Sequence, residues 1–301
     1  MAQSKKSWIA TRLEYAVALS LVTILRVLPL SAANTMARAA ARLLDTAVPK
    51  LRRVGLTNLS FAFPDLDPAS RNRIVDGVFR SIARLLVAIA RIPLLNKSNI
   101  SGWIDYDGFE NYAAAKREGR GVLVATAHLG NWELSAFSHA LMTEAMNVMV
   151  RPLDNPLIDD LVENRRTASG NRLIFKRDAA RLVLKALRNN EAVGILIDQN
   201  TTPAEGVFIR FFGKLACAGT AFAKFAGHSG AAVVPGFALW DESRERYVLR
   251  FYPKVELTGE IAADTQRIHS VFEQIIREHP DQWMWIHRRW KTRPPGEPPL
   301  Y

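Results

Sequence analysis

Apolar and polar positions change their spacing along the chain, and this change distinguishes two kinds of segment. From Gly121 onward, short runs of apolar and β-branched residues alternate with longer segments in which apolar residues recur every three or four positions. The short runs predict strands and the longer segments predict helices. Such alternation is typical of an α/β domain with a mostly parallel central sheet flanked by helices. Strands are expected at residues 121–127, 146–151, 172–175, 192–197, 231–238 and 246–252, and helices near 132–143, 155–168, 178–189, 218–229 and 264–278.

Before Gly121 the pattern is helical. Residues 36–44 are rich in Ala and Arg, and residues 70–91 repeat apolar side chains at helical spacing. The stretch 54–68 between them contains Pro64 and Pro68, which predicts a connector. We therefore divide the chain into a membrane-anchoring or interfacial N-terminal helix, a helical arm and an α/β domain, at residues 1–33, 34–100 and 101–301.

The N-terminal apolar run allows three interpretations. The run Tyr15–Leu25 ends at Arg26 and Pro29, short of the roughly 20 residues that a spanning helix needs. A secretory signal is the first interpretation, because the basic residues Lys5, Lys6 and Arg12 precede the run. A buried core helix is the second interpretation. An anchor at the membrane surface is the third, and the basic, apolar character of the segment favours it.

Composition narrows the class of protein. With 301 residues, 49% of them hydrophobic, the chain can bury a large core. Its one cysteine, Cys217, excludes an intramolecular disulfide framework and a cysteine-based zinc site, and fits a reducing compartment. The net charge of +11 predicts an anionic partner, and residues 1–53 supply +7 of it from nine Lys or Arg and two acidic residues. Because this basic segment is apolar, an acidic membrane is favoured over a nucleic acid.

The stretch Gly121–Ser138, GVLVATAHLGNWELSAFS, combines structural and chemical signals. Its Gly-Asn pair ends the predicted strand, and Asn131 suits the N-cap of the following helix. His128 at the strand end and Glu133 in the first helical turn are then expected to face each other. A carboxylate that holds one imidazole nitrogen leaves the other free to accept a proton, so His128 and Glu133 are the candidate catalytic pair. A purely structural histidine is the alternative.

Other predicted strands also end in polar residues. Arg151 follows the second strand, and Asp198, Gln199 and Asn200 follow the fourth. In open α/β sheets, ligands bind beyond the carboxyl ends of the strands, so these residues are expected to share one rim. Arg151 could bind a phosphate or carboxylate there, unless it only caps the next helix.

A second polar group follows the fourth predicted strand. Glu205 precedes a glycine turn, and Arg210 interrupts the aromatic run Val207–Phe212. A charge within an apolar run is costly unless it is paired or faces a ligand, so Arg210 and Lys214 are candidates for binding an anionic head group. The alternative is that the run is plain core.

Several other chemistries are not indicated. The GHSGA block at residues 227–231 lacks the last glycine of a nucleophile elbow and lies before a strand instead of a helix. No Walker A sequence or complete dinucleotide-binding fingerprint is present, and the six His form neither an H-x-H nor an H-E-x-x-H array. We expect neither a cofactor nor a metal.

The C-terminal segment QWMWIHRRWKTRP, residues 282–294, interleaves tryptophans with arginines and lysine. Such residues are able to stack on single-stranded nucleic acid. They also suit a membrane interface, where Trp lies at head-group depth and basic residues bind phosphates.

Several blocks together resemble the lipid A late acyltransferase family, the lauroyl and myristoyl transferases of Gram-negative inner membranes. They are HLGNWE at 128–133, EGVFIRFFG at 205–213, PGF at 235–237, NLSFAFP at 58–64 and the C-terminal segment. The resemblance covers nearly the whole chain. The H-x4-E block alone is shared with the wider glycerolipid acyltransferase superfamily, which implies a glycerol-3-phosphate acyltransferase-like fold.

The resemblance implies transfer of a fatty acyl group from acyl-acyl carrier protein, or acyl-CoA, to a hydroxyl of a lipid A precursor at the cytoplasmic face of the inner membrane. His128 would take the proton of the hydroxyl and Glu133 would orient His128, with no covalent enzyme intermediate. The implied partners are acyl carrier protein, anionic membrane lipids and a phosphorylated glycolipid acceptor, and not nucleic acid. The substrate-binding residues are expected to be Asn131, Arg151, Asp198, Glu205 and Arg210.

Two alternatives stay open. Phosphatidylinositol mannoside acyltransferases resemble the same H-x4-E architecture, so another glycolipid is a possible acceptor. A membrane- or nucleic-acid-binding module without chemistry is the alternative from a different class, and the basic, Trp-rich C-terminal segment is its support.

Overall fold

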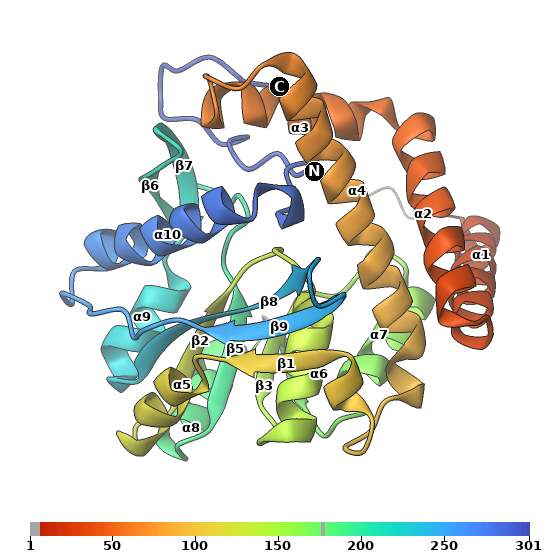
Figure 1. The fold of residues 1–301 in the computed structure, drawn as a ribbon. Coiled ribbons are helices and arrows are strands. Elements are labelled where there is room, and N and C mark those ends of the chain that lie inside the picture. Colours follow the sequence, from red (N-terminus) through yellow and green to blue (C-terminus); the bar gives the residue numbers. More distant parts are fainter. Residues whose placement is uncertain (1–6, 176–177) are drawn as a thin grey trace.

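A seven-stranded, mostly parallel sheet forms the centre of the molecule (Figure 1). The computed structural model describes residues 7–175 and 178–301, so Lys5 and Lys6 lie outside the described residues. The strand order is β1-β9-β8-β2-β5-β3-β4, in which β8 and β9 pair antiparallel and the other neighbours pair parallel. This confirms the predicted α/β class. The strands are β1 (Ile104–Asp107), β2 (Val122–Thr126), β3 (Asn147–Val150), β4 (Arg172–Phe175), β5 (Ala192–Leu196), β8 (Ala232–Asp241) and β9 (Arg246–Phe251).

Helices cover both faces of this sheet. One face carries α5 (Phe109–Arg117) and α6 (Trp132–Met142). The other carries α8 (Ala179–Arg188), α9 (Ala221–Ser229) and α10 (Ile261–Glu278). In β2, Leu123 and Ala125 join the core on the α10 side, whereas Val122 and Val124 join the core on the α6 side. An unbroken apolar run is therefore what this strand requires, because both of its faces are buried.

Four helices precede the sheet. They are α1 (Trp8–Val27), α2 (Leu30–Ala47), α3 (Pro49–Ala62) and α4 (Pro68–Arg91), and α7 (Pro156–Thr167) lies between α6 and α1. The connector predicted at residues 54–68 is wrong for most of its length, because α3 continues to Ala62. A buried stripe that includes Asn58 and Leu59 holds this helix against its neighbours. Pro64 and Pro68 come after the end of α3. Pro68 occupies the first turn of α4, and Asp67 is the N-cap of that helix.

The first helix is longer than the apolar run predicted. It has 20 residues and is long and apolar enough to cross a membrane by length and composition, and 11% of its most apolar window is buried. Asn155, at the start of α7, donates to the carbonyl of Thr11 at 2.8 Å and to Glu14 at 3.1 Å. The large apolar side chains that are at least 64% exposed on this helix are Trp8, Ile9, Leu13, Val17 and Val27.

The N-terminal helix and the helical arm share a core with the α/β part. Leu25, Leu59 and Val75 belong to the same buried cluster as Phe272 and Trp285. In Figure 1, α4 runs across the molecule from α3 towards α7, alongside the sheet. The division at residues 33 and 100 stays a prediction about the organisation of the sequence.

Some elements were not predicted. They are β1, α5 and a separate hairpin made of β6 (Gly206–Phe211) and β7 (Lys214–Gly219). The two-residue loop of the hairpin, Phe212 and Gly213, has φ angles of 50° and 73°. Loops of this type are usually recognised from Asn-Gly or Asp-Gly, and Phe in the first position gives no such signal.

Candidate active site

His128 and Asp198 meet at the carboxyl-terminal edge of the sheet. β2 and β5 are parallel neighbours in which Thr126 pairs with Leu196, so the residues two positions later lie side by side. His128 Nδ1 is 2.8 Å from Asp198 Oδ1, and the His128 main-chain N–H donates to Asp198 Oδ2 at 3.0 Å. The sequence placed Asp198 on this rim as a substrate-binding residue. The structure places it behind the imidazole, as the hydrogen-bond partner of His128.

Asp198 is a buried carboxylate. Its exposed fraction is 2%, and Trp283 Nε1 also donates to it at 2.8 Å. Burial alone would raise the pKa of Asp198, but the charge of His128 and the hydrogen bonds from His128 and Trp283 lower it to about 2. The group is therefore ionised at neutral pH, which favours the His128 tautomer with its proton on Nδ1 and leaves Nε2 as the acceptor.

Gln199 occupies the other side of the imidazole. Its side chain is exposed, and its amide nitrogen lies 3.3 Å from His128 Nε2. In the tautomer that Asp198 favours, this amide is the donor to Nε2. A hydroxyl that displaces the amide would find a nitrogen able to accept its proton.

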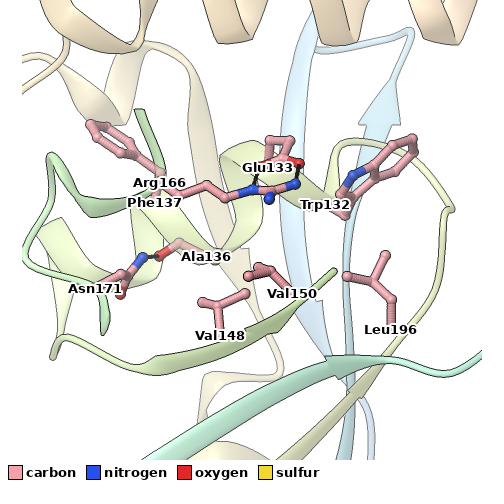
Figure 2. Close-up of a pocket in the computed structure, with 9 residues that line it drawn as sticks. All are labelled: Trp132, Glu133, Ala136, Phe137, Val148, Val150, Arg166, Asn171 and Leu196. Atoms are coloured by element: carbon pink, nitrogen blue, oxygen red, sulfur yellow. Dashed lines mark hydrogen bonds and ion pairs between the residues drawn. The ribbon is translucent and has the colours of Figure 1, made fainter. Parts of the chain in front are cut away.

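The predicted contact between His128 and Glu133 is wrong. Arg166, on α7, donates from Nε to Glu133 Oε2 at 2.9 Å and from a terminal nitrogen to Oε1 at 2.6 Å (Figure 2). Burial would lower the pKa of Arg166, but the ion pair with Glu133 raises it. The first turn of α6 directs Glu133 towards α7, whereas the His128 ring packs edge-on against Trp132, with 4.9 Å between ring centroids. The sequence could not predict that Arg166 pairs with Glu133, because nothing distinguishes Arg166 from its neighbour Arg165.

Asn131 and Gly130 fix the turn between His128 and α6. Asn131 Oδ1 accepts the Leu134 N–H at 3.0 Å, which confirms the predicted N-cap. Because Asn131 is fully buried, it positions the helix and offers no exposed surface to a substrate. Gly130 has a φ of 64°, and a Cβ there would lie 2.0 Å from the carbonyl oxygen of Ala238, so the turn requires glycine.

The C-terminal segment holds this turn in place. Leu129 forms a bridge with Trp283, and the Met284 N–H donates to the His128 carbonyl at 3.0 Å. Trp283, Trp285 and Trp290 are at most 2% exposed. The prediction that these tryptophans stack on nucleic acid or lie in a membrane interface is therefore wrong, because they form part of the core.

Asn58 of the NLSFAFP block binds the C-terminal segment. It is fully buried on α3 and donates to the carbonyls of Trp285 at 2.7 Å and His287 at 2.9 Å. Two main-chain acceptors of the C-terminal segment are thereby satisfied by a helix that lies more than 220 positions earlier in the chain. The block positions the site through this segment instead of contacting His128.

The remaining predicted substrate-binding residues do not gather around His128. Arg151 follows β3 at the same edge of the sheet, is exposed, and makes no hydrogen bond or ion pair with the part of the chain that the structure describes. Glu205 is exposed directly before β6.

Arg210 lies on the β6–β7 hairpin and is exposed, while its neighbours Ile209 and Phe211 are buried. Strand alternation therefore turns it to solvent, and the expectation that its charge needs a partner or ligand within an apolar run is wrong. Lys214 lies over the Phe61 ring, with Nζ 5.2 Å from the centroid.

Apolar hollows adjoin the site on the α6 face of the sheet. Two of them, each with a cavity volume of about 30 Å³, share Trp132, Ala136, Val148 and Leu196 as lining. Figure 2 shows the Glu133–Arg166 pair across the first hollow from Val148 and Leu196. A third, of about 10 Å³, lies between α4 and the site and is lined by both His128 and Trp132. Among the described residues, no three His, Cys, Asp or Glu side chains come together as a metal site.

The chain matches known proteins over most of its length. The profile of the family described as bacterial lipid A biosynthesis acyltransferase matches residues 3–292. The chain is 30% identical over 247 residues to the lipid A biosynthesis lauroyltransferase of Escherichia coli K12, a match that covers 81% of the chain and 80% of that protein. It is also 30% identical over 261 residues to the lipid A biosynthesis palmitoleoyltransferase of the same strain, with 85% and 84% covered. A lipid A biosynthesis acyltransferase of Haemophilus influenzae is 26% identical over 250 residues, with 82% and 78% covered.

These matches exclude a binding module without chemistry. The family profile spans α1 to most of the C-terminal segment, and so includes the loop with His128, the strand end with Asp198 and the buried tryptophans. The chain therefore belongs to the bacterial lipid A biosynthesis acyltransferase family and is an acyltransferase.

Proposed function

We propose that the protein transfers a fatty acyl group from an acyl thioester, carried by acyl carrier protein or CoA, to a hydroxyl of a lipid A precursor at the cytoplasmic face of the inner membrane. The observation that supports this most is the His128–Asp198 pair beside adjoining apolar hollows. A base and a place for a hydrocarbon chain are what acyl transfer to a hydroxyl needs.

In the proposed reaction, the acceptor hydroxyl replaces the Gln199 amide at His128 Nε2. Its proton passes to Nε2 as its oxygen bonds to the thioester carbonyl carbon, and Asp198 stabilises the imidazolium that forms. When the tetrahedral intermediate collapses, the carbon–sulfur bond breaks, and the proton on Nε2 passes to the leaving thiolate. The ester and the free thiol are the products, and no enzyme nucleophile takes part.

The acyl chain of the donor is proposed to enter at the two hollows beneath α6 and to displace the side chains that narrow them to about 30 Å³ each. Their lining is mainly apolar, and Trp132 lies between them and the His128 ring. A chain that enters past Trp132 would keep its thioester next to the base. Glu133 then acts with Arg166 as a half-buried ion pair that joins α6 to α7 in the wall of the first hollow, and its effect on His128 is indirect.

The acceptor is proposed to approach along the same sheet edge. Arg151 is exposed there without a partner among the described residues, which suits a phosphate of the acceptor. Glu205 and Arg210 would contact a more distant part of the acceptor, since they lie on or next to the β6–β7 hairpin. The basic N-terminal segment, residues 1–53, would attract an acidic carrier protein.

Membrane association is proposed to use α1. Its exposed side chains Ile9, Leu13 and Val17 recur at intervals of four residues and form one apolar stripe. The polar contacts from Asn155 to the first turns of α1 support a helix that lies on the bilayer while attached to the rest of the protein.

The test is mass spectrometry of lipid products from a tetra-acylated lipid A precursor and mixed acyl-acyl carrier proteins. We expect wild-type enzyme to add one acyl mass and His128→Ala to lose on the order of 10² to 10⁴ in rate. His228→Ala, an exposed histidine at the end of α9, is the matched control and should be unchanged. Persistent activity of His128→Ala would remove His128 as the base. No product with wild type would point to another acceptor, such as a phosphatidylinositol mannoside.

A further inference from the structure

A hollow of about 250 Å³ lies in the helical arm, away from His128. Its walls come from α2, α3 and α4, and its apolar lining consists of Ala41 and Phe79. The polar lining contains four arginines and two aspartates: Arg38, Arg42, Arg52, Arg80, Asp45 and Asp76. With four positive and two negative charges, the lining carries a net charge of +2.

One of the arginines is fixed within the protein. Arg52 donates to both carboxylate oxygens of Asp45, at 2.6 to 3.1 Å, and to Asp76 at 2.6 Å and Asn72 at 3.1 Å. Its hydrogen bonds to Asp45 raise the pKa of its guanidinium. Both aspartates are thereby occupied by one cation, so they have little capacity left for a second.

The other three arginines are not used in this way. The side chains of Arg38, Arg42 and Arg80 are exposed and make no hydrogen bond or ion pair with any described residue, and the Arg80 charge only helps to lower the pKa of Glu242. Arg38 and Arg42 are one helical turn apart on α2, and Arg80 faces them from α4. Three guanidinium groups around an apolar floor form a place for an anion with several oxygen atoms and an attached apolar group.

A neighbouring helix indicates the source of that anion. α2 packs on α1, whose exposed apolar side chains are proposed above to lie on the bilayer. Guanidinium groups on a helix that packs against such a membrane-bound helix suit the phosphate of a lipid head group.

We propose that this hollow binds the phosphodiester of one anionic glycerophospholipid of the membrane, such as a phosphatidylglycerol. It is separate from the small hollow between α4 and the active site. Phe79 and Arg80 line the arm hollow, whereas Val78 and Ile82 of the same helix line the small hollow together with His128. The inference deepens the proposed membrane association and rests on it. A lipid held here fixes the arm at the bilayer at a defined point.

The test is titration of the full-length protein with dihexanoyl phosphatidylglycerol below its critical micelle concentration, so that no membrane surface contributes. We expect saturable one-to-one binding that weakens about tenfold or more in Arg38→Ala/Arg42→Ala, because two charge-assisted contacts are lost. Neither side chain has a partner to leave unpaired, so the melting temperature should not change. Arg52 is left intact because its removal would leave Asp45 and Asp76 uncompensated.

The matched control is Arg53→Ala/Arg73→Ala, which removes two charges from exposed positions of the same arm outside the hollow. It should bind as wild type does. Equal losses in the two double variants would overturn the proposal in favour of general electrostatic attraction. Inorganic phosphate that binds as tightly as the lipid would overturn the lipid assignment.

Two further measurements distinguish this inference from the proposed function. Flotation of the wild-type protein with phosphatidylglycerol vesicles tests membrane association itself. Acyl transfer in detergent without phospholipid tests the reaction, and there Arg38→Ala/Arg42→Ala should retain wild-type kcat and acceptor KM. A raised acceptor KM in this assay would assign the hollow to the acceptor and overturn the phospholipid proposal.

Discussion

At the scale of single residues, the site separates the roles of two carboxylates that the sequence could not tell apart. Asp198 contacts His128 through a ring nitrogen and a main-chain N–H, and is held in turn by Trp283. Glu133 contacts Arg166. In the proposed reaction Asp198 orients the base directly, and Glu133 maintains the packing of α6 on α7.

The first prediction compares two isosteric changes. Asp198→Asn should lower kcat by on the order of 10² to 10⁴, because the amide favours the wrong imidazole tautomer. Glu133→Gln should lower kcat less and should instead lower stability by about 1 to 2 kcal/mol, because it leaves the half-buried Arg166 charge unpaired. Steady-state kinetics and urea unfolding of both variants measure this.

The control for this comparison is Glu133→Gln combined with Arg166→Met. Removing both charges should restore most of the stability that Glu133→Gln loses. If Glu133→Gln, correctly folded, reduces kcat as much as Asp198→Asn does, then Glu133 acts on His128 in a conformation other than the one described here.

At the scale of elements, β5 contributes to both parts of the site. Its end carries Asp198, and its middle carries Gly194, which lines the second hollow with Met146 of the α6 face. A Cβ on Gly194 would lie 3.0 Å from the flexible end of the Met146 side chain. A side chain at position 194 would therefore push the end of Met146 into the hollow at which the acyl chain is proposed to enter.

The second prediction follows from this contact between position 194 and Met146. Gly194→Val should shift the preference between the longest accepted chain and one two carbons shorter by roughly tenfold towards the shorter chain, since one methylene in an apolar pocket has about that effect. The measurement is mass spectrometry of products formed from an equimolar mixture of acyl donors. A stable variant with an unchanged chain-length distribution would place the acyl chain elsewhere.

At the scale of the whole molecule, two buried histidines make stability depend on pH. His139 and His269 are each 1% exposed, and burial lowers the pKa of both to about 4. In the unfolded chain they titrate near 6.5, so between these values the unfolded state binds more protons than the folded state. Stability is therefore fully present above about pH 6.5 and is lost as the pH falls towards 4.

The third prediction gives the size of this effect. Burial also lowers the pKa of His287 to about 4, so three protons are involved and the free energy of unfolding should fall by up to about 4 kcal/mol per pH unit between pH 6.5 and 4. Urea unfolding at several pH values measures the slope, and His139→Phe should reduce it by its own share, about a third. A slope unchanged in that variant would show that His139 is protonated when folded or that other groups dominate.

The sequence by itself determined the α/β class, the position of most strands and helices, the N-cap at Asn131 and the rim that holds His128 and Asp198. These features depend on local patterns: the spacing of apolar residues, capping preferences and the polar residues at strand ends. The family resemblance was also readable from short blocks of sequence.

Only the tertiary structure decided which carboxylate meets His128 and what the C-terminal tryptophans do. The partner of His128 depends on the register of β2 against β5, strands separated by about 70 positions, and no local pattern encodes that register. The burial of Trp283, Trp285 and Trp290 likewise depends on helices and strands far away in the chain. Apolar aromatic residues suit a core, a membrane interface and a stack of bases equally well, so only their packed neighbours distinguish these roles.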